Sequence, residues 1–369
     1  MRFPAGMNWM KHWTHFALFH ERDKNNNQRK RKKKLMINIT KDDLYPLLFE
    51  PAYKQVFWGG EKFRSVLKRP LPEDLPPLGE AWDICDRPNF SSPVLNGPLA
   101  GSTLRELLEH FGGDLVGGNY HGGPFPVIVK IVDARQRLSM QVHPTEDFCS
   151  THEFCESKTE MWYVLQADKD AQIYAGLSST ATRQSFLSTL RDPEVESQLQ
   201  QFDSIAGDAY FLPAGRIHFL GAGNLVLEIS QNSDTSFRIS DWGRTDENGE
   251  KRELNTRDAI TCMEFIDRTV PRICGASDVT EHNRKYPIIN RCPYFHCDEL
   301  ILVSDLRDST ASSGSFHILT AVNGSFEVSN RKTAVRVDYG SSVLIPACFG
   351  DYRIAIEEGK NVNIIRTTL

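Results

Sequence analysis

The sequence predicts a mainly β fold, a barrel or a sandwich, built from two copies of one β-unit with helical insertions. Three observations support this prediction. Short runs of β-branched and aromatic residues separated by turns dominate from Pro126 onward, one turn motif occurs twice, and helical periodicity is confined to two segments. With 369 residues, of which 40% are apolar and 25% charged, the chain can bury a large core without cross-links.

Six runs between residues 127 and 239 have the length and composition of β-strands. The proline-rich region before them, around residues 70–88, is expected to form irregular connections. The six runs are 127–132, 137–142, 161–165, 209–212, 225–229 and 237–239.

Helical patterns occur in two places. Thr103 and Glu106 form a capping box, apolar residues follow at helical spacing through Phe111, and Gly112 ends the segment. A second pattern runs from about Thr182 to Phe202, so we expect a helical insertion near residues 180–203.

An internal repeat indicates two copies of one β-unit. The segment from Gly207 through Pro213 to His218 reappears as Gly340 through Pro346 to Asp351, with each marked position displaced by 133 residues. Upstream, residues 163–167 resemble 317–321. The second copy keeps the turn but has Asp351 where the first has His218. We therefore expect a first β domain over residues 36–265 and a second, degenerate copy over 266–369.

The N-terminal segment differs in composition from the rest. Residues 1–35 carry ten Lys or Arg and two Asp or Glu, so the remaining chain must be acidic to give the net charge of −5. This basic segment has no periodic apolar pattern, and we expect it to be disordered. An acidic body is a poor surface for nucleic acid. No apolar stretch is long enough to cross a membrane.

The eight cysteines form no CxxC pair, and no apolar leader segment stands near the N-terminus. We therefore expect no disulfide framework and a cytoplasmic, reducing setting.

The strand around residue 140 has one apolar and one polar face. Because side chains alternate along a strand, Ser139, Gln141 and His143 share a face opposite Leu138, Met140 and Val142. Gln and His two residues apart can offer an oxygen and an imidazole to one point. A solvated strand face explains this pattern equally well when the segment is taken alone.

Two further residues favour a metal site. Glu160 opens an aromatic strand, where a carboxylate is costly unless it is paired or bound to a cation. His218 follows the repeated turn. The set Gln141, His143, Glu160 and His218 suits zinc first and is tolerable for manganese, iron or cobalt. Four ligands with a net charge of −1 leave room for water or substrate, as catalytic sites do.

Cationic residues form a second candidate group. Lys130 and Arg238 lie between apolar strand residues, where an unpaired charge would be costly. Lys158 and Arg244 stand near the candidate ligands in sequence, and Ser139 lies on the metal-facing side of its strand. Structural ion pairs with Asp241 or Glu228 are the alternative explanation.

Several motifs resemble type I mannose-6-phosphate isomerase (phosphomannose isomerase) of the short bacterial kind, a member of the cupin superfamily. The resemblance extends from Tyr45 to the C-terminus. Its motifs are Phe57-Trp-Gly-Gly60, Ser139-Met-Gln-Val-His-Pro144, Lys158-Thr-Glu160, Pro213-Ala-Gly-Arg-Ile-His218, Gln231-Asn-Ser-Asp-Thr-Ser-Phe-Arg238 and Asp241-Trp-Gly-Arg244.

The resemblance implies a mainly β fold of two cupin-like jelly-roll β-barrels with helical insertions. It implies further that the second barrel holds no metal and that one zinc ion is bound by the four ligands inferred above. It also implies catalytic roles for Arg238, Glu228 and Lys158, and phosphate contacts from Ser139, Lys130 and Arg244. Phe237 and Ser240 depart from the residues more common in the family, so the wall of the site could differ.

The resulting hypothesis is an aldose-ketose isomerase that interconverts mannose 6-phosphate and fructose 6-phosphate through a cis-enediolate. The base remains open between Glu228 and Lys158. Alternatives are another metal-dependent cupin enzyme, such as a glucose-6-phosphate isomerase or a dioxygenase, and a sugar-sensing cupin without turnover. The expected partner is a small sugar phosphate, with no nucleic acid, no membrane and a monomeric chain.

Overall fold

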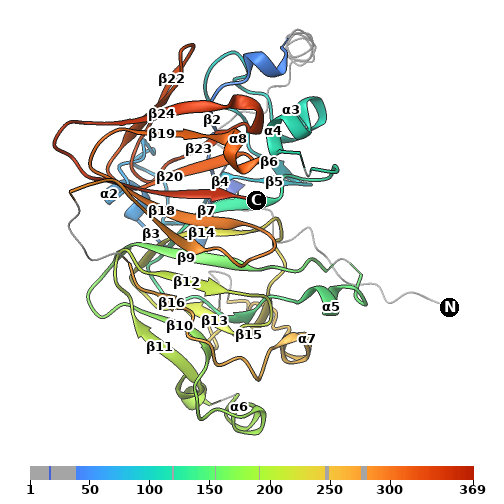
Figure 1. The fold of residues 1–369 in the computed structure, drawn as a ribbon. Helices are drawn as coiled ribbons and strands as arrows, with labels where there is room; N and C mark the ends of the chain where they lie inside the picture. Colours follow the sequence, from blue (N-terminus) through green and yellow to red (C-terminus); the bar gives the residue numbers. More distant parts are fainter. Residues whose placement is uncertain are drawn as a thin grey trace.

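The computed structural model describes residues 16–17 and 39–369, apart from 119, 154, 191, 246–248 and 276–280. Within these residues the fold is mainly β, as predicted (Figure 1). The expected disorder of residues 1–35 falls outside the described residues except at Phe16–Ala17, which form strand β1.

Two sheets are formed mainly by the chain up to residue 273, called the first half below, and two mainly by the chain from residue 284 onward, called the second half. In the described residues an eight-stranded sheet has the order β1-β3-β4-β7-β14-β9-β12-β16, and a five-stranded sheet has the order β11-β10-β13-β8-β15. The strands of the first are β1 (Phe16–Ala17), β3 (Ala52–Gly60), β4 (Leu78–Ile84), β7 (Val127–Ala134), β14 (Asn224–Gln231), β9 (Glu160–Ala167), β12 (Ala209–Leu212) and β16 (Arg272–Ile273). Those of the second are β11 (Leu199–Asp203), β10 (Gln172–Leu177), β13 (His218–Leu220), β8 (Met140–Val142) and β15 (Phe237–Ser240).

The second half repeats this arrangement. Its described strands form a six-stranded sheet, β17-β18-β25-β20-β23-β2, and a four-stranded sheet, β19-β24-β21-β22. The strands are β17 (Arg284–Ile289), β18 (His296–Leu302), β25 (Val362–Thr368), β20 (His317–Asn323), β23 (Ser342–Ile345), β2 (Leu47–Leu48), β19 (Leu306–Ser309), β24 (Asp351–Ile356), β21 (Phe326–Ser329) and β22 (Ala334–Val337). Because β2 joins this sheet, the N-terminal part of the chain crosses into the second half. The division at residue 265 stays a prediction.

The four sheets stack as layers (Figure 1). Adjacent residues of β14 pack on opposite faces of the eight-stranded sheet. Leu227 packs in one core cluster with Ile318 and Ile365 of the six-stranded sheet. Val226 packs in another with Ile173 of the five-stranded sheet. The eight-stranded sheet is therefore buried on both faces, as its nearly continuous apolar strands require. A separate core fills the space between the six- and four-stranded sheets.

Helices occupy the connections between strands. The capping-box helix is confirmed: in α3, the Thr103 hydroxyl accepts from the Glu106 amide, the Glu106 carboxylate accepts from the Thr103 amide, and Gly112 follows the last turn with φ +47°. The helices are α2 (Lys62–Ser65), α3 (Leu104–Phe111), α4 (Gly113–Val116), α5 (Glu146–Cys149), α6 (Arg183–Thr189), α7 (Thr256–Cys262) and α8 (Thr310–Ser313), and the 3-10 helices are η2 (Lys41–Asp43), η3 (Pro193–Gln198) and η4 (Ala347–Phe349). A short hairpin is formed by β5 (Asp86–Arg87) and β6 (Phe90–Ser91).

Three local expectations need correction. The insertion near 180–203 is helical only in α6 and η3, because its last part forms β11, which satisfies its backbone groups by pairing with the edge of β10. Residues 78–84 form a strand of the largest sheet in spite of the surrounding prolines. A disulfide joins Cys149 and Cys155, whose Cα atoms lie 4.9 Å apart across the turn that follows α5, although no disulfide framework was expected.

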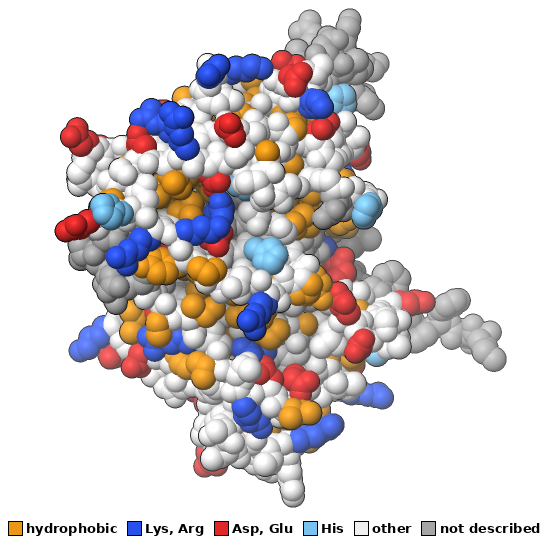
Figure 2. All heavy atoms as spheres, in the orientation of Figure 1, with side chains coloured by type: hydrophobic (Ala, Val, Ile, Leu, Met, Phe, Trp, Pro, Cys, Tyr) orange, Lys and Arg blue, Asp and Glu red, His pale blue; other side chains and the backbone are white. Residues whose placement is uncertain are grey.

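No helix in the described part of the chain is long and apolar enough to cross a membrane. On the face shown in Figure 2, acidic and basic side chains are interspersed, with small apolar areas between them.

The strand register confirms the later part of the internal repeat and corrects the earlier part. Leu212 pairs with Glu160 in the first half, and Ile345, 133 residues further on, pairs with His317 in the second. The position equivalent to His317 is therefore Glu160 and not Tyr163. The short matching strings were misaligned by three residues, because a few apolar letters do not fix a strand register.

Stability should depend on pH through His317. This side chain is fully buried and bonded to the hydroxyls of Ser313 and Tyr352. Burial lowers its pKa to about 4, against the opposing effect of Asp308. Because the unfolded chain takes up this proton at a higher pH than the folded chain, stability is lost as the pH falls from about 6.5 toward 4. The expected loss is on the order of 2–3 kcal/mol.

Denaturant unfolding at pH 4.5 and 7 measures this effect. The His317→Gln variant should show a pH dependence reduced by the His317 contribution, with that of the buried His218 remaining, whereas a variant of the exposed His121, His121→Gln, should keep the full wild-type dependence. An unchanged pH slope in His317→Gln would contradict the assignment.

Candidate metal centre

The five-stranded sheet brings three predicted site residues together. β8 lies between β13 and β15, so Gln141 is directly opposite His218 on one side and Arg238 on the other. The predicted alternation is observed within β8, because Met140 and Val142 are fully buried in the core on the opposite face. It does not extend to Leu138, which precedes the strand and packs in the core between the two sheets. Gln141, His218 and Arg238 therefore face the space between the two sheets of the first half.

The facing sheet contributes Glu160, the first residue of β9. One donor atom each from His143, Glu160 and His218 lies within 4.8 Å of the others, and all three residues are buried. His143 Nε2 is 3.2 Å from Glu160 Oε2, and His218 Nε2 is 3.4 Å from Glu160 Oε1. Three residues far apart in sequence thus converge on one point.

Hydrogen bonds fix both imidazole rings in a ligand orientation. His218 Nδ1 lies 2.8 Å from the Arg216 carbonyl oxygen, and His143 Nδ1 lies 3.2 Å from the Thr235 carbonyl oxygen. A carbonyl only accepts, so each Nδ1 carries the proton and each Nε2 presents its lone pair to the centre. Burial, with a contribution from His143, lowers the pKa of His218 to about 3, which keeps this ring neutral.

The donor set fits a divalent ion. Among the described residues, His143 Nε2 and Glu160 Oε1 are buried without a hydrogen-bond partner, a costly arrangement that a bound cation would relieve. Although burial alone raises the pKa of Glu160, the neighbouring Lys158 and imidazoles hold it well below its usual value. Two neutral imidazoles and one carboxylate are borderline ligands of the kind that zinc prefers.

Gln141 stands beside this trio. Its amide nitrogen lies 3.4 Å from His218 Nε2, so rotation of the amide by half a turn would direct its oxygen toward the same point. The structure thus places all four predicted ligands at one centre, with three within reach of a common ion and the fourth adjacent.

A network of buried charges extends from Glu160. Lys158 Nζ lies 2.6 Å from Glu160 Oε2 and donates to Glu228 Oε1 at 2.9 Å. Although burial alone lowers the pKa of Lys158, the two carboxylates raise it well above its usual value. Lys130 lies directly opposite Glu228 on β7, with its Nζ 3.8 Å from that carboxylate.

Sequence reasoning missed four members of this network. Lys130 Nζ also approaches Glu80 and Asp234, at 3.9 and 3.6 Å, and stands 4.0 Å from the centre of the Trp82 ring. Lys54 lies 3.4 Å from Glu80. Glu80 and Trp82 are two residues apart on β4 and so share a face of the strand, as Gln141 and His143 were expected to do. This spacing would have identified them as candidates once residues 78–84 were recognised as a strand.

The remaining predicted residues form an arginine-rich group. Arg238 Nε donates to the Ser139 hydroxyl at 3.3 Å, and Arg244 Nη2 donates to Asp241 at 2.5 Å. Burial, then the charges of Arg252 and Arg244, lower the pKa of Arg238 to about 10. Ser139 and Arg244 therefore both belong to the surroundings of Arg238, whereas the described ion pairs of Lys130 are to acids on the other side of the site.

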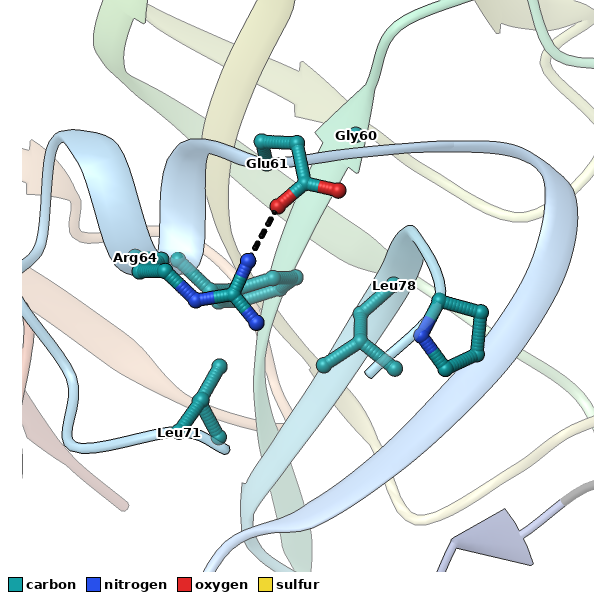
Figure 3. Close-up of a pocket in the computed structure, with 7 residues that line it drawn as sticks. Gly60, Glu61, Arg64, Leu71 and Leu78 are labelled. Atoms are coloured by element: carbon teal, nitrogen blue, oxygen red, sulfur yellow. Dashed lines mark hydrogen bonds and ion pairs between the residues drawn. The ribbon is translucent and has the colours of Figure 1, made fainter. Parts of the chain in front are cut away.

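Figure 3 shows a separate surface pocket beside α2, where Arg64 and Glu61 form an ion pair of 2.6 Å. It contains none of the predicted site residues. Its lining is Gly60, Glu61, Phe63, Arg64, Leu71, Pro76 and Leu78.

The fold and the centre define a class of two-copy β proteins with a buried candidate metal site in the first copy, flanked by paired acids and bases. The family model for the phosphomannose isomerase type I catalytic domain matches residues 47–177. The probable mannose-6-phosphate isomerase GmuF of Bacillus subtilis (strain 168) is 32% identical over 84% of this chain and 96% of its own length. The mannose-6-phosphate isomerase ManA of the same organism is 31% identical over 84% and 95%. The chain belongs to the type I phosphomannose isomerase family.

Solved structures agree with this assignment. The crystal structure of the mannose 6-phosphate isomerase from Bacillus subtilis superposes with a TM-score of 0.75 at 27% identity, covering 88% of this chain and all of the other. A phosphomannose isomerase mutant from Salmonella typhimurium has the same fold at 14% identity, with a TM-score of 0.70.

Metal binding should be lost when either the carboxylate or one imidazole is removed. We expect the wild-type chain to retain one divalent ion after dialysis and Glu160→Gln and His143→Ala to retain much less. At a free ion concentration 100 times the Kd, binding stabilises the native state by about 2.7 kcal/mol. Added zinc should therefore raise the melting temperature of the wild type and not that of the two variants.

His121→Gln is the matched control, because His121 is exposed. Elemental analysis together with the melting shift checks the site without an activity assay. One tightly held ion in Glu160→Gln would show that the ligands lie elsewhere.

Proposed function

We propose that this chain is a mannose-6-phosphate isomerase that interconverts mannose 6-phosphate and fructose 6-phosphate. The observation that carries the proposal is the His143, Glu160 and His218 centre with the Lys158–Glu228 pair beside it, in a chain of this family. All of these residues come from one chain, so we propose that a monomer suffices. The substrate is a small sugar phosphate.

We propose zinc as the resident ion, held by Gln141, His143, Glu160 and His218. When bound, it supplies Lewis-acid stabilisation of negative charge that develops on substrate oxygens. The requirement for such chemistry follows from the reaction, in which a proton leaves a carbon atom and an enediolate forms.

Glu228 is proposed as the base that moves the proton between C1 and C2. The Lys158 ammonium already donates to Glu228 and contacts Glu160, so it has no lone pair to accept a proton in this arrangement, whereas a carboxylate retains acceptor capacity. Lys158 then orients Glu228 and offers a proton donor to a substrate oxygen. A positioned acid or base of this kind contributes roughly 10² to 10⁴ in rate.

Arg238 is proposed to stabilise the charge that develops on the substrate. It lies directly opposite Gln141, one of the residues that would hold the ion. Its guanidinium could therefore donate a hydrogen bond to the substrate oxygen on which negative charge develops. Ser139 and Arg244, which both lie around Arg238, are proposed as contacts for the phosphate end of the substrate. Lys130, the third residue expected there, is surrounded by three carboxylates, so we propose a weaker role for it in binding phosphate.

The direct test is a coupled assay for fructose 6-phosphate formation, with solvent deuterium incorporation at C2 as the second measurement. Glu228→Gln should lower kcat by about 10²-fold or more while keeping its metal, because only the base is lost. Glu327→Gln, at an exposed site in the second half, is the control. Chelation should abolish turnover, and added zinc should restore it.

The outcomes separate the alternatives. Oxygen consumption without ketose formation would indicate a dioxygenase, and turnover of glucose 6-phosphate in preference to mannose 6-phosphate would indicate a different isomerase. Binding of mannose 6-phosphate without C2 exchange would indicate a sugar sensor. Full kcat in Glu228→Gln would remove Glu228 as the base.

A further inference from the structure

Arg252 is the centre of an unassigned feature on the Arg238 side of the site. Its Nε donates to Asp241 Oδ2 at 2.8 Å and its Nη2 donates to the other oxygen of the same carboxylate. Arg244 also donates to Asp241. Both guanidinium groups stand over the Phe57 ring, at 5.1 Å for Arg252 and 4.9 Å for Arg244. Asp241 and the Phe57 ring therefore hold the guanidinium groups of Arg244 and Arg252 close to one another.

Among the residues that the structure describes, this group has more positive than negative charge. Three guanidinium groups, those of Arg238, Arg244 and Arg252, share one buried carboxylate, Asp241, and the second acid that acts on Arg238 is the exposed Glu253. The opposite side of the site differs, because the described residues there pair three lysines with four carboxylates. These are Lys54, Lys130 and Lys158 with Glu80, Glu160, Glu228 and Asp234. A bound anion would therefore balance the excess positive charge on the arginine side, whereas the lysine side has no such excess.

Counting only contacts within the described part of the chain, Arg252 uses fewer of its donors than Arg244 and so has more of them available for an anion. Arg244 donates to the Asp241 side chain, to the Asp241 carbonyl and to the Arg137 carbonyl. A guanidinium has five N–H donors in a planar fork, and the pair with Asp241 uses only the Nε and Nη2 positions of Arg252. Such a fork matches phosphate oxygens in pairs.

The position relative to the metal ligands suits the far end of a sugar phosphate. Ser139, which contacts Arg238, lies two residues before Gln141 on the same face of the chain, about 6.5 Å away in an extended segment. The reacting carbons of the open-chain sugar stand at one end of the molecule and its phosphate at the other. A substrate with its reacting end at the ion would extend its phosphate toward the arginine group.

We propose that Arg252 binds the phosphate dianion of the substrate, with Asp241 and Phe57 holding the guanidinium in place. This inference rests on the isomerase function proposed above and deepens it. Arg252 is then a residue that determines selectivity for phosphorylated over unphosphorylated sugar, and Lys130 serves mainly to balance the surrounding acids.

Two variants test the proposal. Arg252→Gln removes the charge, and Arg252→Lys keeps the charge but loses the fork, so it remains informative if Arg252→Gln does not fold. A charged hydrogen bond of this kind is worth enough to raise KM by about tenfold or more. We expect that rise for mannose 6-phosphate with kcat changed less, a parallel weakening of competitive inhibition by inorganic phosphate, and a smaller effect in Arg252→Lys.

Unphosphorylated mannose provides an internal reference, since its kcat/KM should be the same in the wild type and Arg252→Gln, as should the metal content. Arg336→Gln, which removes an exposed arginine paired with Asp338 in the second half, is the matched control. Unchanged KM for mannose 6-phosphate and unchanged inhibition by phosphate in both Arg252 variants would overturn the inference.

The proposed function can fail separately. If the metal-loaded wild type does not isomerise mannose 6-phosphate but binds inorganic phosphate in an Arg252-dependent manner, the isomerase proposal fails and Arg252 stands as an anion-binding residue. If the wild type is active and both Arg252 variants match it, only the role of Arg252 is lost.

Discussion

The buried carboxylate of Glu160 is the constraint on which the site depends. A fully buried charge is tolerated only where partners compensate it, and removal of one partner from a buried pair typically costs about 3–5 kcal/mol. Lys158 supplies part of this compensation, and a cation held between Glu160 and the imidazoles of His143 and His218 would supply the rest. The carboxylate thus fixes the first residue of β9 against the ends of β8 and β13, so the two sheets of the first half must face one another closely.

The second half of the chain supports the site without contributing a candidate ligand. On β7 and β14, Lys130 and Glu228 face the site, whereas Leu227 and Ile131, each one residue away in its strand, pack in the core shared with the second half. Covering that face with the six-stranded sheet buries it, which the apolar strands of the eight-stranded sheet require. The charges on the site face are therefore carried by strands that are immobilised on their other face, which favours a preorganised arrangement.

The sequence allowed the centre to be predicted because its signals were local. The alternation around Gln141, the isolated Glu160 and the repeated turn before His218 each identify a residue without knowledge of its partners. Arg252 gave no such signal, and the spacing of Glu80 and Trp82 is informative only once residues 78–84 are recognised as a strand. The proposed role of Arg252 depends on Asp241, eleven residues earlier, and on Phe57, which lies far from it in sequence. The proximity of Cys149 to Cys155 likewise depends on the turn after α5, which no cysteine spacing rule predicts.

The same buried strand position holds a charged carboxylate in the first copy and a neutral imidazole in the second, and the surroundings of each explain the difference. His317 occupies the place of Glu160, opposite the equivalent residue of the partner strand, and Asp351 occupies that of His218. Without a lysine such as Lys158 or an ion, a carboxylate at the first position would be uncompensated. A neutral imidazole bonded to Ser313 and Tyr352 avoids that cost. The equivalent position in the second copy is thus part of a hydrogen-bonded core, and the only described cluster of His, Cys and acidic residues suited to a metal lies in the first copy.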